Sequence, residues 1–426
     1  MIRFKNGLVM TMNGGCETAE LEVWTEGDKI AFVGKPSDEQ LKNARFEREI
    51  DLDGNLLMPA FKNAHTHSAM TFLRSYADDL PLQEWLFNRV FPLEAKLTGE
   101  DVYWFTKVAI LEYLTSGVSA SFDMYFKLDD YIKANIDCGF RTVLCHAVSG
   151  ERERVKEVED CYLKYNGMHP LISQRLGFHA EYTATLGLME GIAELAEKYK
   201  APVSMHSSET AQEVHDCKER YGKTPTKLFD DLGLYNYGGA AFHCVHMTKE
   251  DEMILAKRGV WVVTNPCSNA KLISGTAPIA QMDDMGINLA IGTDGPASNN
   301  ALDMFREMYL LSVEQKLQEL DAGAMQPERI LEMACCGSAL AMGLDDCDCI
   351  AEGKQADLIV IDLMRPNMQP VNNIPKNIVY SGSKENVQLT MVAGRVLYER
   401  GEFFVGEDVR RIYARANELT QDLKMR

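Results

Sequence analysis

Histidines and acidic residues recur at the ends of short apolar runs along this chain. His65 and His67 close the run LLMPAFKNAHTH, and His206 closes the run APVSMH. Asp294 follows the apolar run INLAI in the segment GTDG. In an extended segment residues i and i+2 point the same way, so His65 and His67 can present both imidazoles to one metal ion. Imidazole nitrogens and carboxylate oxygens at these positions predict a metal site.

Each of these residues also has an ordinary structural interpretation. His65 and His67 could be hydrogen-bonded histidines at a strand end, and the segment after His206 could be the capped start of a helix. Asp294 could form a turn with Gly295. The metal interpretation is favoured because several such residues end different strands, and because an unpaired buried carboxylate costs free energy.

The four residues form a nitrogen and oxygen ligand set that suits one Zn²⁺ ion, with Fe²⁺ or Mn²⁺ as alternatives. One coordination position would stay open for water, whose pKa a bound metal lowers from 15.7 toward about 7. Asp294 could accept the proton of this water, and Glu209, three residues after His206, could carry it to a leaving group. His243, which ends the run AAFH, could orient the nucleophile or polarise a developing oxyanion. Together these residues predict hydrolytic chemistry.

These residues require a scaffold that brings the ends of distant strands together. Over residues 57–350 short apolar runs alternate with helix-length amphipathic segments, which is typical of a (β/α)8 TIM-like barrel with catalytic residues at the carboxyl ends of its strands. Residues 1–56 and 351–426 show short strands with Asn-Gly, Gly-Gly and Ala-Gly turns, followed by a helix from Glu407. We therefore expect the α/β class: a metallohydrolase barrel at residues 57–350 and a small β-sandwich domain formed from both chain ends. Residues 1–56 would be its first part, and residues 351–426 its second part plus the C-terminal helix.

Composition excludes several classes of partner. The 426 residues contain 44 Lys and Arg against 63 Asp and Glu, a net charge of −19, so a nucleic-acid partner is not expected. No run approaches the ~18–20 uncharged apolar residues of a membrane span, so no membrane partner is expected either. The 11 cysteines are scattered without a CxxC pair, which favours a cytoplasmic location and argues against a cysteine zinc site. A small-molecule substrate is expected, and assembly into a homo-oligomer is left open.

Seven segments, in order, resemble the amidohydrolase superfamily and, within it, the 5′-methylthioadenosine/S-adenosylhomocysteine deaminase family. They are MPAFKNAHTHSAM, DLPLQEWLFNRVFPLE, SFDMYF, MHSSET, AAFHCVH, NPCSNAKLISGTAPI and GTDGPASNNALDMFREM. The resemblance implies the four metal ligands named above and gives catalytic roles to Glu209, His243 and Asp294. It implies zinc-dependent hydrolytic deamination of 5′-methylthioadenosine, S-adenosylhomocysteine, 5′-deoxyadenosine or adenosine to the inosine product and ammonia. Glu209 would also contact the substrate, because it would protonate N1 of the adenine.

The same resemblance implies further substrate-binding residues. Glu94 in VFPLE matches a carboxylate that binds ribose hydroxyls, and His179 in LGFHA matches a histidine near the purine. Their structural alternatives are a surface glutamate paired with Lys96 or Arg89, and a histidine that only supports the fold. Trp85 is expected either in the wall of the pocket or in the core, within a segment long enough to be a lid.

Two positions depart from the family pattern. Some members carry an arginine that meets the homocysteine carboxylate, and this chain has His146 in its place. Arg154 in ERERVKEVED could supply one cation, or could be a solvated charge on a helix. His146 and Arg154 are both expected at the substrate, with weak use of S-adenosylhomocysteine. Thr264 stands where relatives often have a histidine, and no effect is predicted for it.

Other functions compete with this interpretation. Guanine deamination is less favoured because HTHSAM lacks the Gln that follows HxH in those enzymes. Triazine dechlorination fits less well, since Glu209 and His243 suit expulsion of an amine, which needs a proton, whereas chloride leaves without one. A non-catalytic scaffold predicts lost ligands, and every expected metal position is filled. The remaining histidines are given structural roles: His169, His215 and His246.

Overall fold

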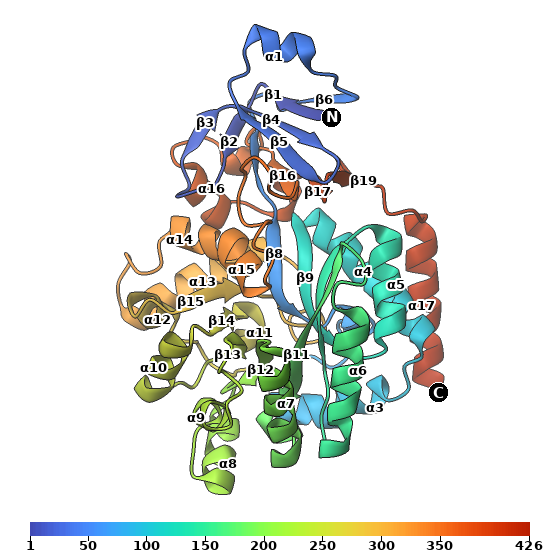
Figure 1. The fold of residues 1–426 in the computed structure, drawn as a ribbon, viewed down its shortest axis with the longest axis vertical. Helices are drawn as coiled ribbons and strands as arrows, with labels where there is room; N and C mark the ends of the chain where they lie inside the picture. The colour runs from blue at the N-terminus through green and yellow to red at the C-terminus, as the bar shows by residue number, and fades with distance from the viewer.

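The computed structural model describes residues 1–426, and its central element is an eight-stranded parallel barrel (Figure 1). The strand order is β15-β14-β13-β12-β11-β10-β9-β8, and every neighbouring pair is parallel. The predicted TIM-like barrel is thereby confirmed. Its strands are β8 (Phe61–Thr66), β9 (Val118–Tyr125), β10 (Arg141–His146), β11 (Ile172–Ala180), β12 (Val203–Ser207), β13 (Gly239–His243), β14 (Trp261–Thr264) and β15 (Asn288–Ile291).

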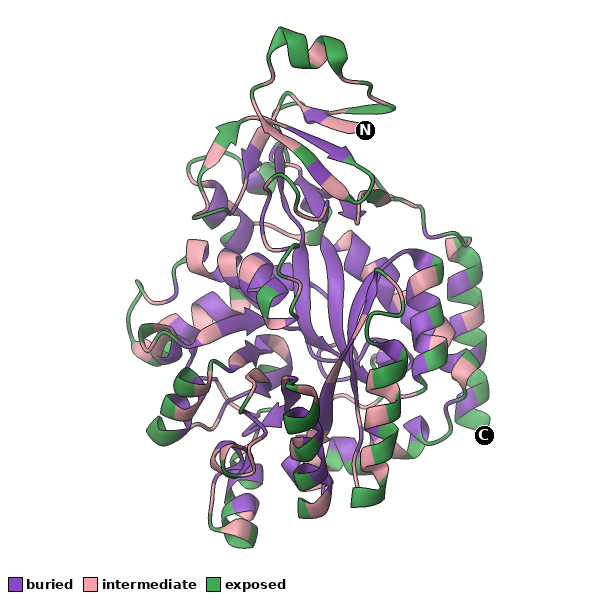
Figure 2. Cartoon of the chain, in the orientation of Figure 1, coloured by how far each residue is buried: buried purple, intermediate pink, exposed green.

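Helices surround the barrel, with buried faces toward the strands and exposed faces outward (Figure 2). Two of the covering helices begin with a capping box, at Thr98 and Thr248. None of the helices combines the length and apolar character that a membrane span requires. The longer helices are α4 (Gly99–Thr115), α5 (Leu128–Cys138), α6 (Val155–Tyr165), α7 (Leu186–Tyr199), α8 (Ala211–Tyr221), α10 (Lys249–Arg258) and α13 (Met304–Glu319), and the shorter ones are η1 (Ser68–Leu73), α2 (Leu82–Trp85), α3 (Phe91–Glu94), α9 (Pro225–Asp231), α11 (Pro266–Lys271), α12 (Ile279–Asp284), α14 (Pro327–Glu332) and α15 (Ser338–Ala341).

The barrel closes between β8 and β15 through backbone hydrogen bonds to the carbonyl oxygen of His65. Thr293 and Asp294 both donate their backbone N–H to the carbonyl oxygen of His65, at 3.1 and 3.0 Å. Gly292 is required at this seam, because a Cβ there would lie 2.8 Å from the backbone nitrogen and oxygen of His65. The seam therefore brings Asp294 next to His65.

Two further sheets form the β-sandwich expected from both chain ends. Their strand orders are β5-β4-β1-β6 and β19-β18-β17-β16-β7-β2-β3. Phe4 and Val23 of the first sheet share one apolar core with Leu358 and Leu389 of the second. The strands are β1 (Ile2–Lys5), β2 (Leu8–Met10), β3 (Thr18–Glu20), β4 (Glu22–Glu26), β5 (Lys29–Gly34), β6 (Arg48–Asp51), β7 (Leu56–Pro59), β16 (Leu358–Ile361), β17 (Val387–Val392), β18 (Arg395–Glu399) and β19 (Glu402–Phe403), with short helices α1 (Asp38–Asn43) and α16 (Ile374–Tyr380).

The change from sandwich to barrel occurs within the run LLMPAFKNAHTH, after residue 59 and not after residue 56 as predicted. β7 pairs with β2 and β16 in the sandwich, and the chain then enters the barrel at Phe61. Arg141 of the barrel and Asp357 form a buried ion pair across this junction, with Nε 3.0 Å from Oδ2. The C-terminal helix α17 (Val409–Met425) leaves the sandwich and packs against α4, so it covers the barrel rather than the sandwich (Figure 1).

Candidate active site

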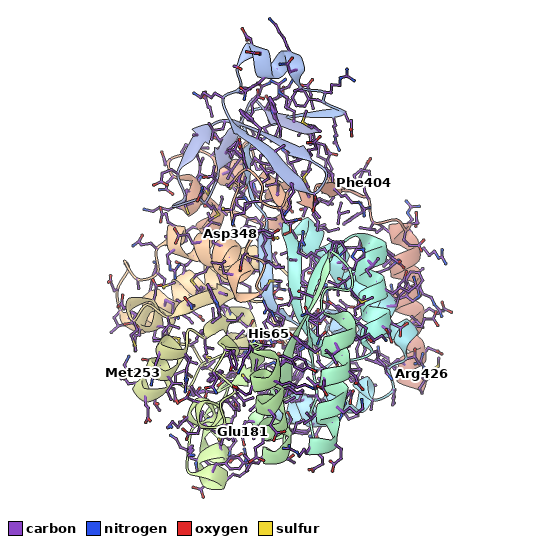
Figure 3. The ribbon with its side chains drawn as sticks, in the orientation of Figure 1. His65, Glu181, Met253, Asp348, Phe404 and Arg426 are labelled. Atoms are coloured by element: carbon purple, nitrogen blue, oxygen red, sulfur yellow. The ribbon has the colours of Figure 1, made fainter.

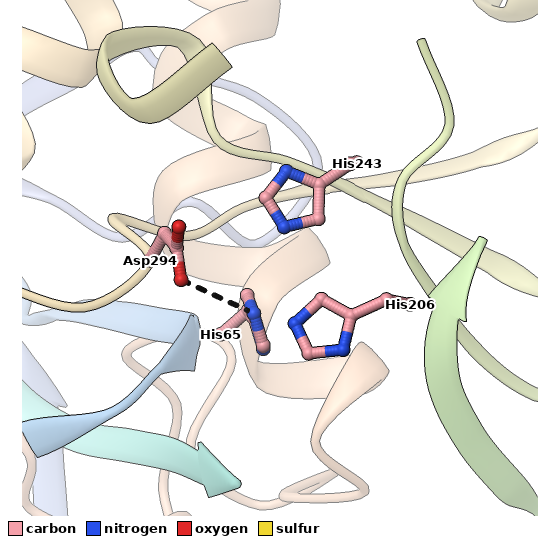
Figure 4. A group of neighbouring side chains, drawn as sticks. All are labelled: His65, His206, His243 and Asp294. Carbon is pink, nitrogen blue, oxygen red and sulfur yellow. Dashed lines mark ion pairs between the residues drawn. The ribbon is translucent and has the colours of Figure 1, made fainter. Parts of the chain in front are cut away.

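Three of the predicted metal ligands and the predicted catalytic residue His243 gather at the carboxyl ends of the barrel strands. His65 lies on β8, His206 on β12 and His243 at the end of β13, while Asp294 follows β15. In Figure 3, His65 lies inside the barrel, below the sandwich. The ligand atoms of these four buried residues all lie within 4.8 Å of one another (Figure 4). Residues separated by more than 200 positions in the sequence thus meet in one cluster.

His67 adjoins this group. Its Nε2 lies 3.2 Å from Oδ1 of Asp294, and Nε2 of His65 lies 3.6 Å from the same oxygen. The cluster therefore contains three of the four predicted ligands together with His243, and the fourth, His67, lies beside it against Asp294.

Three of the histidines use Nδ1 for a hydrogen bond. Because the acceptors are carbonyl or amide oxygens, each Nδ1 carries a proton, which leaves Nε2 as the nitrogen that each ring can present to a metal ion. Metal-bound histidines are oriented by such bonds. Each bond is 2.7 Å long: His67 donates to the carbonyl oxygen of Met124, His206 to the carbonyl oxygen of His179, and His243 to the side-chain oxygen of Asn269.

His65 provides the test of whether the cluster fits a metal ion. Both of its ring nitrogens are buried without a hydrogen-bond partner, an arrangement that costs ~1–3 kcal/mol for an unsatisfied polar group. Burial lowers the pKa of His65 and of His206 well below the usual value, so both imidazoles are neutral and able to donate a lone pair. Neutral imidazoles with one carboxylate are a ligand set that fits zinc.

Asp294 is held as a carboxylate with one oxygen toward the histidines. Its Oδ2 accepts hydrogen bonds from the hydroxyls of Ser268 at 2.6 Å and Ser298 at 2.7 Å. Burial opposes the charge, but the hydrogen bond and charge of His67 outweigh burial and hold the pKa of Asp294 well below its usual range. The side chain is thus used for the cluster and not for a turn with Gly295. Asp294 also has a left-handed φ of 57°, a strain of the kind found at functional sites.

Glu209 lies beside the cluster, with Oε1 3.9 Å from Nδ1 of His243. The hydroxyl of Ser274 donates to the same oxygen at 3.2 Å, and the backbone N–H of Glu209 donates to the Glu213 carboxylate at 2.7 Å. Helix α8 is capped by Thr210, so Glu209 is not the capping residue. Burial raises the pKa of Glu209, which suits a group that must carry a proton near neutral pH.

A cavity of about 570 Å³ opens over the cluster. Its volume lies within the range of small-molecule sites, roughly 300–1,000 Å³. The wall includes apolar residues from the segment after η1, among them Trp85, as expected. None of the three histidines given structural roles lines the cavity. The predicted substrate-binding residues all do: Glu94, His146, Arg154, His179 and Glu209.

Glu94 and His179 occupy the middle of the cavity wall. Glu94 is 8% exposed and accepts a hydrogen bond of 2.8 Å from the hydroxyl of Tyr125. It forms no ion pair with a basic neighbour, so the surface alternative is wrong for this residue. Burial raises the pKa of Glu94 to about 7 and lowers the pKa of His179 to about 3. His179 is therefore neutral beside the cluster.

His146 and Arg154 both contact one carboxylate, that of Glu157. His146 Nε2 lies 2.9 Å from its Oε1, and Arg154 donates from Nε at 2.9 Å and from Nη2 at 3.0 Å. The hydrogen bond from His146, followed by the contacts of Arg154, lowers the pKa of Glu157 to about 2. Arg154 thus lines the cavity and also forms an ion pair at its surface. Thr264 ends β14, is buried and does not line the cavity.

Sequence reasoning did not identify several residues that position the site. They lie within the quoted segments or the charged helix, but serines, asparagines and glutamates are common, and nothing in their spacing marked them. The Arg154–Glu157 spacing of three residues in ERERVKEVED was the one usable signal, since such pairs meet on a helix. The residues are Tyr125, Glu157, Ser268, Asn269, Ser274 and Ser298.

Comparison with known proteins is consistent with this geometry. Residues 56–397 match the model of the Amidohydrolase family. A protein of Caldanaerobacter subterraneus subsp. tengcongensis is 36% identical over 98% of this chain and 98% of its own length, and one of Pyrococcus furiosus is 39% identical over 94% and 95%. Both curated relatives are named 5-methylthioadenosine/S-adenosylhomocysteine deaminase.

Solved structures show the same architecture. An adenosine deaminase from Xanthomonas campestris with bound zinc is similar with a TM-score of 0.93 at 32% identity, covering 100% of this chain and 99% of that one. An atrazine chlorohydrolase from Arthrobacter aurescens, with a TM-score of 0.91 at 22% identity over 99% and 100% of the chains, shares the fold. Because the family model spans most of the sequence and the curated relatives match it almost end to end, this chain belongs to the amidohydrolase family, as its motifs predicted.

Proposed function

We propose that this protein is a zinc-dependent hydrolytic deaminase of adenosine-type nucleosides, 5′-methylthioadenosine among them. The observation that carries the proposal is the buried histidine and aspartate cluster at the base of a nucleoside-sized cavity, with Glu209 beside it. The names of the curated relatives support the substrate class, and the zinc-containing adenosine deaminase supports the metal. The similarity to triazine hydrolases and to a guanine deaminase, at 22% and 20% identity, supports the fold alone.

His65, His67, His206 and Asp294 would hold the zinc ion, and Fe²⁺ and Mn²⁺ stay alternatives that accept the same ligands. When bound, zinc acidifies water, lowering its pKa toward about 7, so that a nucleophile is available at neutral pH. His243, whose Nδ1 donates to Asn269 and lies 3.9 Å from Oε1 of Glu209, is given the catalytic role that the family resemblance implies rather than a place among the ligands.

Each residue around the cluster would have a different role in the reaction, and Asp294 and Glu209 would transfer the protons. Asp294, whose Oδ2 accepts hydrogen bonds from two serine hydroxyls, would take the proton of the attacking water. Glu209 would protonate N1 of the adenine as water adds to C6, and would then carry a proton to the departing ammonia. His243 would polarise the oxygen that adds to C6, with its ring held by Asn269. The sum is water plus the adenosine giving the inosine product plus ammonia.

The remaining cavity residues would position the nucleoside. Glu94 would accept hydrogen bonds from ribose hydroxyls, and His179 would lie against the purine. We also propose the predicted division of the chain into residues 1–56, 57–350 and 351–426, with its first boundary moved so that β7 (Leu56–Pro59) belongs to the sandwich. The 11 free cysteines support a reducing, cytoplasmic location, and homo-oligomer formation stays a prediction.

The test is ammonia release and the ultraviolet change from adenine to hypoxanthine, measured on zinc-loaded protein. Adenosine, 5′-deoxyadenosine, 5′-methylthioadenosine and S-adenosylhomocysteine form the panel, with guanine and a chlorotriazine as competing substrates. We expect turnover of the adenosines, loss of turnover in His206→Ala, and retained turnover in the matched control Thr264→Ser. If the protein releases no ammonia from any adenosine but turns over guanine or the triazine, the proposal is wrong.

A further inference from the structure

The exposed end of the cavity carries a group of charges that the proposed chemistry does not use. Lys127, Arg154 and Glu157 line the cavity here, and the buried side chain of His146 contacts Glu157 from inside the cavity wall. The Arg154 and Glu157 side chains are 41% and 43% exposed, whereas Asp294 in the metal cluster is 9% exposed. A nucleoside whose C6 lies at the buried cluster therefore directs its 5′ substituent toward the exposed end.

The carboxylate of Glu157 already contacts both Arg154 and His146. Its carboxylate accepts two hydrogen bonds from the planar guanidinium of Arg154, and His146 Nε2 lies 2.9 Å from Oε1. A third Arg154 donor, Nη1, bonds to the carbonyl oxygen of Ser149 at 3.1 Å. A carboxylate and a guanidinium paired in this way satisfy each other's geometry. A second anion must then displace Glu157 or lie beside its negative charge.

We propose that Glu157 is a specificity-determining residue that makes the cavity select uncharged or cationic 5′ substituents over anionic ones. The inference rests on the proposed function for the orientation of the nucleoside. An uncharged thioether displaces no ion pair, and an ammonium group can share the Glu157 carboxylate, whereas a carboxylate is repelled by it. Lys127 is the remaining cation, but it is exposed and solvated, where a single ion pair contributes little.

The experiment measures binding of reaction products, which undergo no turnover, to zinc-loaded protein by calorimetry. Three inosine 5′-thioethers of matched chain length carry a methyl, a carboxylate or an ammonium terminus. We expect the anionic ligand to bind wild type about tenfold more weakly than the neutral one, a gap of about 1.4 kcal/mol. In Glu157→Gln this gap falls below about threefold, because Arg154 and His146 become free to meet the anion.

Two further variants test whether the change in the binding gap is specific to the charge of Glu157. Glu153→Gln makes the same chemical change on the same segment, outside the cavity lining, and should keep the tenfold gap. Arg154→Gln removes the two guanidinium hydrogen bonds to Glu157 and should widen the gap against the anion. Thermal melting of each variant checks that the fold is retained.

The outcomes distinguish this inference from the proposed function. An unchanged gap in Glu157→Gln overturns the role of Glu157, whatever the deaminase assay shows. If the binding gap depends on Glu157 as expected but no adenosine is turned over, the proposed reaction is wrong and the role of Glu157 stands. If none of the three nucleosides binds wild type, the cavity is not a nucleoside site, and both the function and the inference are wrong.

Discussion

Replacement of Glu94 by glutamine tests whether the buried carboxylate in the cavity wall binds the ribose. Glu94 is 8% exposed and accepts one hydrogen bond, 2.8 Å from the hydroxyl of Tyr125. A carboxylate has about four lone-pair sites, so it can accept two ribose hydroxyls in addition. Glutamine keeps the size of the side chain but has one accepting oxygen and no charge.

The expected loss follows from the strength of these bonds. A hydrogen bond to a charged group contributes about 1.5–3 kcal/mol, so losing one of two costs about 2 kcal/mol, a ~30-fold decrease in kcat/KM. Burial raises the pKa of Glu94 to about 7. The carboxylate is therefore present above pH 7 and is lost as the pH falls through 7, so kcat/KM should fall by up to about tenfold per pH unit below that value. This acidic limb should be absent in Glu94→Gln.

The assay is kcat/KM from about pH 6 to about pH 8 for 5′-methylthioadenosine and for its 2′,3′-dideoxy counterpart. The loss should be confined to the ribonucleoside. Tyr125→Phe removes a hydrogen bond that lowers the pKa of Glu94, and should move the acidic limb to higher pH. An equal loss for both nucleosides, or an acidic limb that survives in Glu94→Gln, would refute a role in ribose binding.

Three other predictions follow from the site and the domain junction. Glu209→Gln should lower kcat by about 10²–10⁴-fold with unchanged zinc content, because the proton carrier is lost; a normal kcat would contradict this role. His67→Ala should lose zinc, while His243→Ala should keep zinc but lose activity, as checked by metal analysis; the opposite result would exchange their roles. Arg141→Met leaves the buried carboxylate of Asp357 unpaired and should cost about 3–5 kcal/mol in urea unfolding, which Asp357→Asn in the same chain should partly restore.

The fold class and the position of the site were predictable because their signals are local. Alternating strand and helix patterns indicate a parallel barrel, and such a barrel places its site at the carboxyl ends of the strands. His65 and His67 were identified because the period of a strand is two. The boundary at β7 was missed, since Leu56–Pro59 and Phe61–Thr66 form one apolar run whose two halves pair with different sheets.

The sequence by itself determined which chemical groups stand at the strand ends, because strand periodicity and residue type are properties of neighbouring residues. Only the tertiary structure decided which of them meet. Asn63 donates to the hydroxyl of Thr293 across 230 positions at 2.7 Å, and such bonds at the barrel seam bring Asp294 beside His65. The contact between His146 and Glu157 was likewise decided by the tertiary structure. These partners are selected by barrel closure and burial, which no local pattern encodes.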